Sequence, residues 1–216
     1  MIRNPFPSTF IYEFSIDPVL VDNALKDLLA EETYAISAIQ NEVSVPAKSL
    51  YHKNSEISYK PVYQKELFDE IQKHVDSVCD THFSNSKLAI CDSWLTQTQF
   101  GQNSSMHPHS FSIFSGLLYL SDHSNSTTYF ELDDPFYEKY KILFGPALKH
   151  NIYTYNSPPV KGKLLLWDSS IRHKITTHKE RTTRYTLAFN TWLSGELGTL
   201  PTAKLTSHVV DVSKPV

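Results

Sequence analysis

The stretch 106–116, MHPHSFSIFSG, places two histidines two positions apart, ahead of an apolar segment that ends at a glycine. In an extended segment, residues i and i+2 point to the same face, so His107 and His109 can converge on one point. Imidazole is the commonest metal ligand in proteins and suits iron, zinc, copper and nickel. The pair alone is weak evidence, because the chain has 10 histidines. A metal site therefore needs a further ligand from elsewhere in the sequence.

A third histidine and an arginine follow at the right places. The stretch 160–176, VKGKLLLWDSSIRHKIT, contains a turn glycine, an apolar strand, a tight Asp-Ser-Ser turn and then His173. Further on, Arg184 and Thr186 share one face of another predicted strand. An arginine inside a small β-barrel is costly unless it meets an anion, and its planar fork suits a carboxylate. The pattern predicts a metal beside a carboxylate-bearing ligand. Arg181 is the alternative anion partner, but it does not share the face of Thr186.

Length and composition indicate one domain spanning residues 1–216. The chain is 40% hydrophobic and 20% charged, which is ordinary for a globular protein. Its net charge of −3 gives no sign of nucleic-acid binding. No apolar run approaches the ~20 residues of a membrane span, and the opening MIRNPFPSTF lacks the apolar core of a signal peptide, so we expect no membrane partner. The only cysteines, Cys79 and Cys91, form no disulfide framework, which favours the cytoplasm.

The pattern of apolar residues predicts helices first and strands later. Helical spacing is found over 18–32 and at about 62–83, with a short strand or two between them. After residue 86, short β-branched and aromatic segments alternate with turn residues, and they predict strands at 88–100, 112–121, 127–132, 150–156, 162–168, 173–177 and 183–193. This order indicates a mainly β (α+β) fold, a sandwich or barrel with the N-terminal helices packed on one outer face. We divide the chain into helical support (about 18–83), barrel (about 88–193) and tail (194–216).

The histidine and arginine motifs resemble those of the Fe(II)- and 2-oxoglutarate-dependent oxygenases, which have a double-stranded β-helix (jelly-roll) fold. In that superfamily a His-x-Asp/Glu pair is followed by a distal His and then by an Arg. More narrowly, the chain resembles the "putative 2OG-Fe(II) oxygenase" subfamily of bacteria and phages. The subfamily's His-x-His-x-x-Ser-x-x-Ser-Gly signature here reads His107, His109, Ser112, Ser115 and Gly116. KGKLLLWDSSIRH and RYTLAFN resemble its two later motifs.

The resemblance implies a dioxygenase that uses Fe(II), 2-oxoglutarate and O2 and releases succinate and CO2. It implies that His107, His109 and His173 bind the iron and are the catalytic residues. It also implies that the far carboxylate of 2-oxoglutarate binds Arg184, assisted by Thr186 and Tyr119. The substrate it implies is an unidentified small molecule or peptide, oxidised most simply by hydroxylation.

Three alternatives stay open. His109 stands where most of the superfamily has Asp or Glu, so a carboxylate from Asp168 or Asp122 is the competing third ligand. A cupin-type metalloenzyme without 2-oxoglutarate shares the barrel, although Ile113 and Phe114 occupy the places where a cupin motif has Glu. A catalytically silent jelly-roll binding protein is the non-enzymatic alternative.

Other conspicuous residues have simpler interpretations. Five aromatic residues are expected in the core, namely Trp94, Phe100, Phe114, Tyr119 and Phe189. We expect Ser115 and Gly116 to serve close strand packing, and Asn190 either to reach the cofactor or to make a strand-end hydrogen bond. The insertion 132–157 is too long for a simple turn and is the predicted substrate-recognition element. The N-terminal strand and the tail are candidate contacts for a homodimer.

Overall fold

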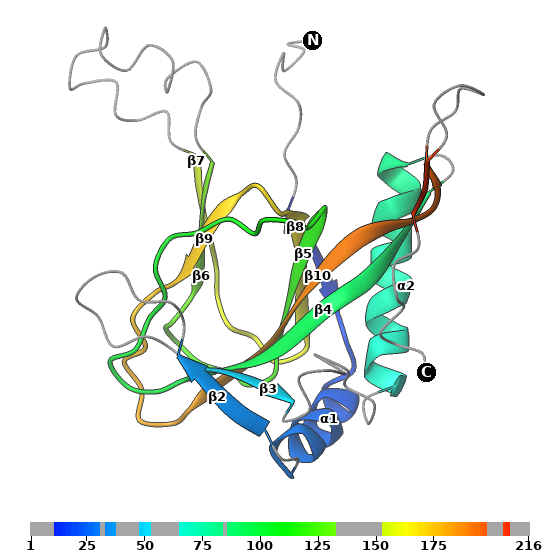
Figure 1. Ribbon diagram of the computed structural model, residues 1–216. Helices are drawn as coiled ribbons and strands as arrows, with labels where there is room; N and C mark the ends of the chain where they lie inside the picture. Colours follow the sequence, from blue (N-terminus) through cyan, green and yellow to red (C-terminus); the bar gives the residue numbers. More distant parts are fainter. Residues whose placement is uncertain are drawn as a thin grey trace, which may run out of the picture.

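The structure is a computed structural model that describes residues 11–30, 33–37, 48–52, 65–83, 86–132, 153–197 and 205–207. Within these residues the chain forms two helices and eleven strands (Figure 1). The helices are α1 (Pro18–Ala30) and α2 (Lys65–His82). The strands are β1 (Ile11–Ser15), β2 (Thr33–Ser37), β3 (Lys48–His52), β4 (Lys87–Thr98), β5 (Phe114–Tyr119), β6 (Thr128–Leu132), β7 (Tyr153–Ser157), β8 (Lys163–Asp168), β9 (Arg172–Ile175), β10 (Arg184–Leu197) and β11 (Leu205–Ser207).

The strands form two antiparallel sheets. The larger sheet has the order β1-β8-β5-β10-β4-β3-β2, with β11 added to β10, and the smaller sheet has the order β7-β6-β9. In Figure 1 the smaller sheet stands opposite β5 and β8 of the larger one. Apolar residues fill the space between the sheets, namely Leu117, Tyr119, Phe130, Leu165, Trp167 and Ile171. Every strand predicted from residue 88 onward is present, and the predicted double-stranded β-helix is confirmed.

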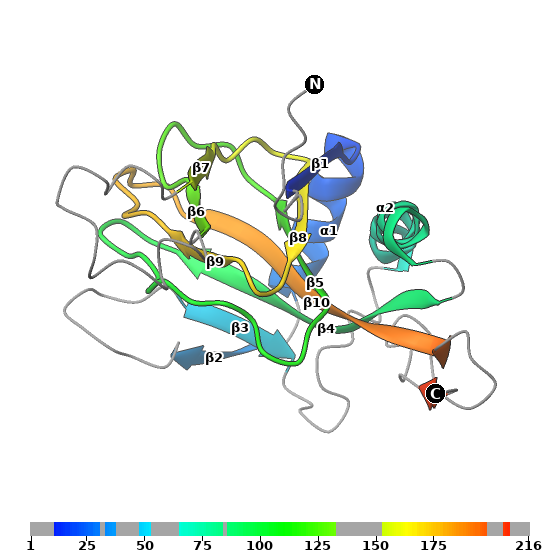
Figure 2. The same cartoon turned by 90° about the horizontal axis from the view of Figure 1, so that it is seen from above.

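The two helices lie on the outer face of the larger sheet, as the sequence predicts (Figures 1 and 2). α1 begins at Pro18, which is favoured at the first helical position, and Asp17 caps the helix by accepting a hydrogen bond from the Val19 amide at 2.9 Å. α2 buries one apolar face, made of Leu67, Phe68, Ile71, Val75, Val78 and Cys79. Neither described helix is long and apolar enough to cross a membrane.

The segment that carries the first two histidines is not a strand, which corrects the expectation of a regular extended segment. It is joined to β9 by one isolated bridge between His107 and His173. It then turns at Phe111, whose φ is 56°, before β5 begins at Phe114. The segment is therefore a loop and not a strand with alternating side chains. The bridge to His173 and the turn at Phe111 fix its path.

The structure also differs from the sequence-based expectation at three further places. β10 continues to Leu197, past the expected barrel end at 193, and β11 of the tail pairs with it. Phe100 is 66% exposed, so its assignment to the core is wrong, because it lies in the turn that follows β4. Of the insertion 132–157, only Leu132 and β7 belong to the described residues, and the rest of that prediction lies outside them.

β5 and β10 approach each other closely at Gly116, as we expected for this glycine. Gly116 pairs with Phe189, and a Cβ at position 116 would lie 2.1 Å from Cζ of that ring. Phe189 is fully buried, so its ring occupies the space in which any other residue would place its side chain. Only glycine fits here without displacing the core.

We expect Gly116→Ala to lower the free energy of unfolding by about 1 to 3 kcal/mol, which is the usual cost of overpacking a core. Urea denaturation measures this change. Adding Phe189→Leu should recover part of the loss, because the smaller side chain relieves the clash. A double variant that is less stable than the sum of the two single variants would contradict this explanation.

Candidate metal centre

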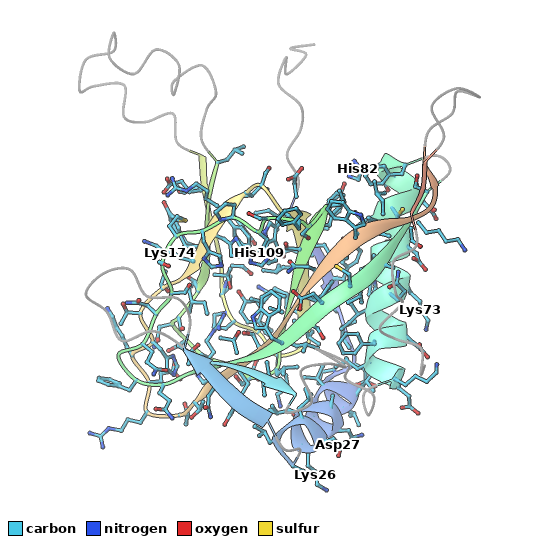
Figure 3. The ribbon with its side chains drawn as sticks, in the orientation of Figure 1. Lys26, Asp27, Lys73, His82, His109 and Lys174 are labelled. Carbon is cyan, nitrogen blue, oxygen red and sulfur yellow. The ribbon has the colours of Figure 1, made fainter. Side chains whose placement is uncertain are left out.

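The structure brings His107, His109 and His173 together, although the last is far from the others in sequence. One ligand nitrogen from each lies within 4.8 Å of the other two. The ring centroids are 5.3 Å apart for His107 and His109, 4.6 Å for His107 and His173, and 4.8 Å for His109 and His173. Figure 3 shows His109 in the interior, between β9 on one side and β5 and β10 on the other. The spacing is suitable for three imidazoles that bind one ion.

Backbone hydrogen bonds hold the loop segment in place. His107 and His173 each donate an amide to the other's carbonyl at 3.0 Å. Two residues on, the His109 amide donates to the Ser169 carbonyl at 2.9 Å. The loop therefore lies along the turn and strand that carry His173, which explains how an irregular segment presents two side chains to the same point.

Each of the three rings uses its Nδ1 in a hydrogen bond with an oxygen. His107 Nδ1 lies 2.8 Å from the Ser105 carbonyl, and His173 Nδ1 lies 3.1 Å from that of Ile171. His109 Nδ1 lies 2.6 Å from Oδ1 of Asn190. A carbonyl oxygen only accepts, so Nδ1 carries the proton in each ring. All three Nε2 lone pairs are therefore free to bind a metal.

Burial keeps two of these imidazoles uncharged. The pKa of His173 is lowered to about 3, mainly by burial and further by the other two histidines. The pKa of His109 is lowered to about 4, again mainly by burial. Aromatic rings lie beside the site. The ring centroids of Trp94 and His109 are 5.6 Å apart, and those of Trp167 and His173 are 4.9 Å apart. A neutral imidazole in dry surroundings is the form that binds a metal.

The two carboxylates considered as alternative ligands are engaged elsewhere. Asp168 is exposed and its Oδ1 accepts hydrogen bonds from the amide and hydroxyl of Ser170, at 2.8 and 2.6 Å. Asp122 accepts from the Lys161 amide at 2.7 Å. Neither belongs to the histidine group, whereas His109 does. The geometry therefore favours His109 as the third ligand.

Sequence reasoning missed a set of polar residues behind His109. Ser115, which we assigned to strand packing, lies 2.8 Å from His109 Nδ1 and donates to Asn190 Oδ1 at 2.9 Å. Asn190 in turn donates from Nδ2 to Asp92 at 3.2 Å. Burial raises the pKa of Asp92, and the hydrogen bond from Asn190 opposes that rise. No sequence signal reveals this set, because it depends on the register in which Asn190 pairs with both Ser115 and Asp92.

Arg184 is buried, and the part of the chain that the structure describes offers it no carboxylate partner. It is fully inaccessible, and burial lowers its pKa. Nη1 donates to Thr186 at 3.4 Å, and Nη2 donates to Thr128 at 3.3 Å. Nε has no hydrogen-bond partner, and among the described residues no acidic side chain pairs with the guanidinium. A buried, incompletely paired guanidinium is costly, so this arrangement is suited to an anion from outside the protein.

The other predicted anion-site residues surround this arginine. The Tyr119 ring lies 5.2 Å from the Arg184 guanidinium carbon, which is within the range of a cation–π contact. Its hydroxyl lies 2.7 Å from Thr128 Oγ1 and 2.9 Å from the Ser157 carbonyl. Thr128 was not predicted. Arg181, the alternative to Arg184, is exposed.

β6 connects the arginine to the histidines. Thr128 contacts Arg184, and Phe130 lies 5.9 Å from the His173 ring. The two β6 residues are on the same face of their strand and so are about 7 Å apart. Arg184 and His173 therefore contact neighbouring positions on the same face of β6. The donor set and the incompletely paired arginine together fit a metal ion chelated by a dicarboxylate.

Solved structures share this fold. The epimerase SnoN from nogalamycin biosynthesis, in complex with Fe3+, alpha ketoglutarate and nogalamycin RO, matches 84% of this chain and 78% of its own with a TM-score of 0.59 and 10% identity. A prolyl-4-hydroxylase from Pseudomonas putida matches 85% and 93% with a TM-score of 0.56 and 11% identity. HygX from Streptomyces hygroscopicus, with nickel and 2-oxoglutarate bound, matches 85% and 82% with a TM-score of 0.52 and 11% identity.

Sequence comparison gives an independent result. Residues 92–190 match the family described as "Putative 2OG-Fe(II) oxygenase", and this segment includes the three histidines, Arg184 and Asn190. No curated protein matches the chain in sequence. The family match thus covers the segment that carries the three histidines and Arg184, and the solved structures share the fold of the chain.

Proposed function

We propose that this protein is an Fe(II)- and 2-oxoglutarate-dependent dioxygenase that hydroxylates a small molecule or a peptide. The observation that carries the proposal is the pairing of two preformed features: three imidazoles with free Nε2 atoms, and a buried arginine without a carboxylate partner among the described residues. The iron and 2-oxoglutarate named for SnoN support the same cofactors here.

Each residue has a separate task in this proposal. His107, His109 and His173 would hold the iron through Nε2. Arg184, Thr186 and Tyr119 would hold the far carboxylate of 2-oxoglutarate and so orient its keto acid end towards the metal. Trp94, Trp167 and Phe130 keep water from the interior side of the site. Bound iron supplies the redox chemistry by which O2 oxidises the substrate while 2-oxoglutarate becomes succinate and CO2.

The setting of the protein is also part of the proposal. Cys79 and Cys91 are both unpaired, which supports a reducing cytoplasm. β1 is at the end of the larger sheet in the described part of the chain, so a second copy could pair with its outer edge to form a homodimer. We assign substrate recognition to the insertion 132–157, because it follows β6 in the sequence and β6 contacts both Arg184 and His173.

The first prediction concerns co-substrate binding. Anaerobic addition of Fe(II) and then 2-oxoglutarate should produce the visible charge-transfer band of the chelate. We expect Arg184→Met to weaken 2-oxoglutarate binding about 10- to 100-fold, because the variant keeps the side-chain volume but loses charge-assisted hydrogen bonds worth about 1.5 to 3 kcal/mol. Arg181→Ala, which removes an exposed arginine nearby, is the matched control and should leave the titration unchanged. Iron binding without any band at saturating 2-oxoglutarate would instead favour the cupin-type or silent alternatives.

The second prediction concerns the ligands. Metal analysis after Fe(II) loading should show loss of iron in His109→Ala and full retention in Asp168→Ala. The reason is that His109 shares the ligand group, while the Asp168 carboxylate is turned to Ser170. The reverse pattern would mean that a carboxylate completes the site.

The third prediction concerns pH and the metal-free protein. The pKa of His173 is about 3 when folded, against about 6.5 in an unfolded chain, so only the unfolded chain gains this proton between those values. The free energy of unfolding should therefore fall as pH decreases, with His173 accounting for about 1 to 2 kcal/mol between pH 7 and pH 5. Urea denaturation of His173→Gln should show a smaller fall by that amount. If the free energy of unfolding falls equally in both proteins, His173 gains its proton in the folded state over this pH range as well.

A further inference from the structure

We propose that Asn190 and Asp92 are positioning residues for His109, and that Asp92 supplies the negative charge that three neutral imidazoles lack. This inference rests on the proposed function, because it takes His109 to be a metal ligand. The residues form a relay, which we define as His109, Asn190 and Asp92 joined by two hydrogen bonds. His109 Nδ1 lies 2.6 Å from Asn190 Oδ1, and Asp92 Oδ2 lies 3.2 Å from Asn190 Nδ2.

Asp92 determines which way the Asn190 amide faces. A carboxylate only accepts hydrogen bonds, so the nitrogen of the amide must point to Asp92 and its oxygen must point to His109. That oxygen accepts the Nδ1 proton of His109, which leaves Nε2 unprotonated and turned to the ligand group. Ser115 donates to the same oxygen and reinforces this orientation. Partners of this kind on the second ring nitrogen orient metal-binding histidines.

The sheet register makes the relay rigid. Asn190 on β10 pairs directly with Asp92 on β4 and with Ser115 on β5, so three adjacent strands contribute to it. The β10–β4 register shifts immediately after Asn190. Cys91 on β4 has no partner at this point, and an irregularity of this kind re-aims side chains locally. The relay is therefore fixed by the backbone of the largest sheet.

The charge of Asp92 is not balanced within the described residues. Its Oδ1 is inaccessible and has no hydrogen-bond partner, and its Oδ2 accepts only from the neutral Asn190 amide. Asp92 is half-buried, and a carboxylate with one inaccessible, unpaired oxygen is stabilised by a nearby cation. A divalent ion on the three imidazoles is two hydrogen bonds away along the relay. The unbalanced carboxylate and the uncharged ligand group thus complement each other.

Two single variants separate positioning from charge. Asn190→Ala breaks both hydrogen bonds and should weaken Fe(II) binding 10- to 100-fold, the usual cost of losing such a partner. Asp92→Asn keeps the shape and an acceptor for Asn190, so it removes mainly the charge. We expect it to weaken Fe(II) binding less than Asn190→Ala and to raise the Fe(III)/Fe(II) reduction potential, since a lost negative charge disfavours the more highly charged ion.

A double variant tests the relay by rescue. Asp92→Asn with Asn190→Asp exchanges the two groups, so that His109 donates to a carboxylate and the new amide at position 92 donates to that carboxylate. Fe(II) affinity and reduction potential should return towards the wild-type values. The matched control is Asp76→Asn on α2, where an exposed carboxylate accepts from the Gln72 amide at 2.8 Å, and it should change neither quantity.

The experiment is anaerobic titration of each purified protein with Fe(II) alone, followed by potentiometry of the iron-loaded forms. Weaker binding in the single variants, with a raised potential in Asp92→Asn and recovery in the double variant, supports the relay. If the wild type binds Fe(II), and both single variants have the same affinity and reduction potential as the wild type, the relay is wrong. The proposed function would still stand. Absence of Fe(II) binding by the wild type would overturn both.

Discussion

The reciprocal pair of backbone hydrogen bonds between His107 and His173 is the constraint on which the site depends. It joins a loop to a strand that lies far along the chain and places two candidate ligands side by side. His109 follows because the next contact, to the Ser169 carbonyl, keeps the loop against the same turn. Without this pairing, the loop that carries His107 and His109 would not be held beside His173.

β10 contributes residues both to the anion site and to the histidine group. Arg184, at its first position, is directed to the anion site, and Asn190, six residues on, contacts His109. Both lie on the same face of one strand in the middle of the larger sheet, paired on both sides for much of that length. The positions of Arg184 and Asn190 relative to each other are thus determined by one regular strand rather than by loops.

Much of this arrangement is predictable from sequence because it depends on short-range periodicity. Alternation places Arg184 and Thr186 on one face, and helical spacing identifies the buried side of α2. The contacts of Asn190 could not be predicted in this way. They depend on strand register between residues 98 positions apart, and no local pattern encodes that register. The expectation for Phe100 was wrong for a related reason, since β4 ends at Thr98 and Phe100 lies in the turn that follows.

The buried Arg184 has a consequence for how the protein survives in a cell. A fold that encloses a guanidinium with no acidic partner in the described chain gives up stability that a bound dicarboxylate restores. A ligand present at 100 times its dissociation constant adds about 2.7 kcal/mol to the stability of the folded state. Such a ligand would also lower the fraction of unfolded chains that proteases can attack, so an empty anion site would shorten the lifetime of the protein.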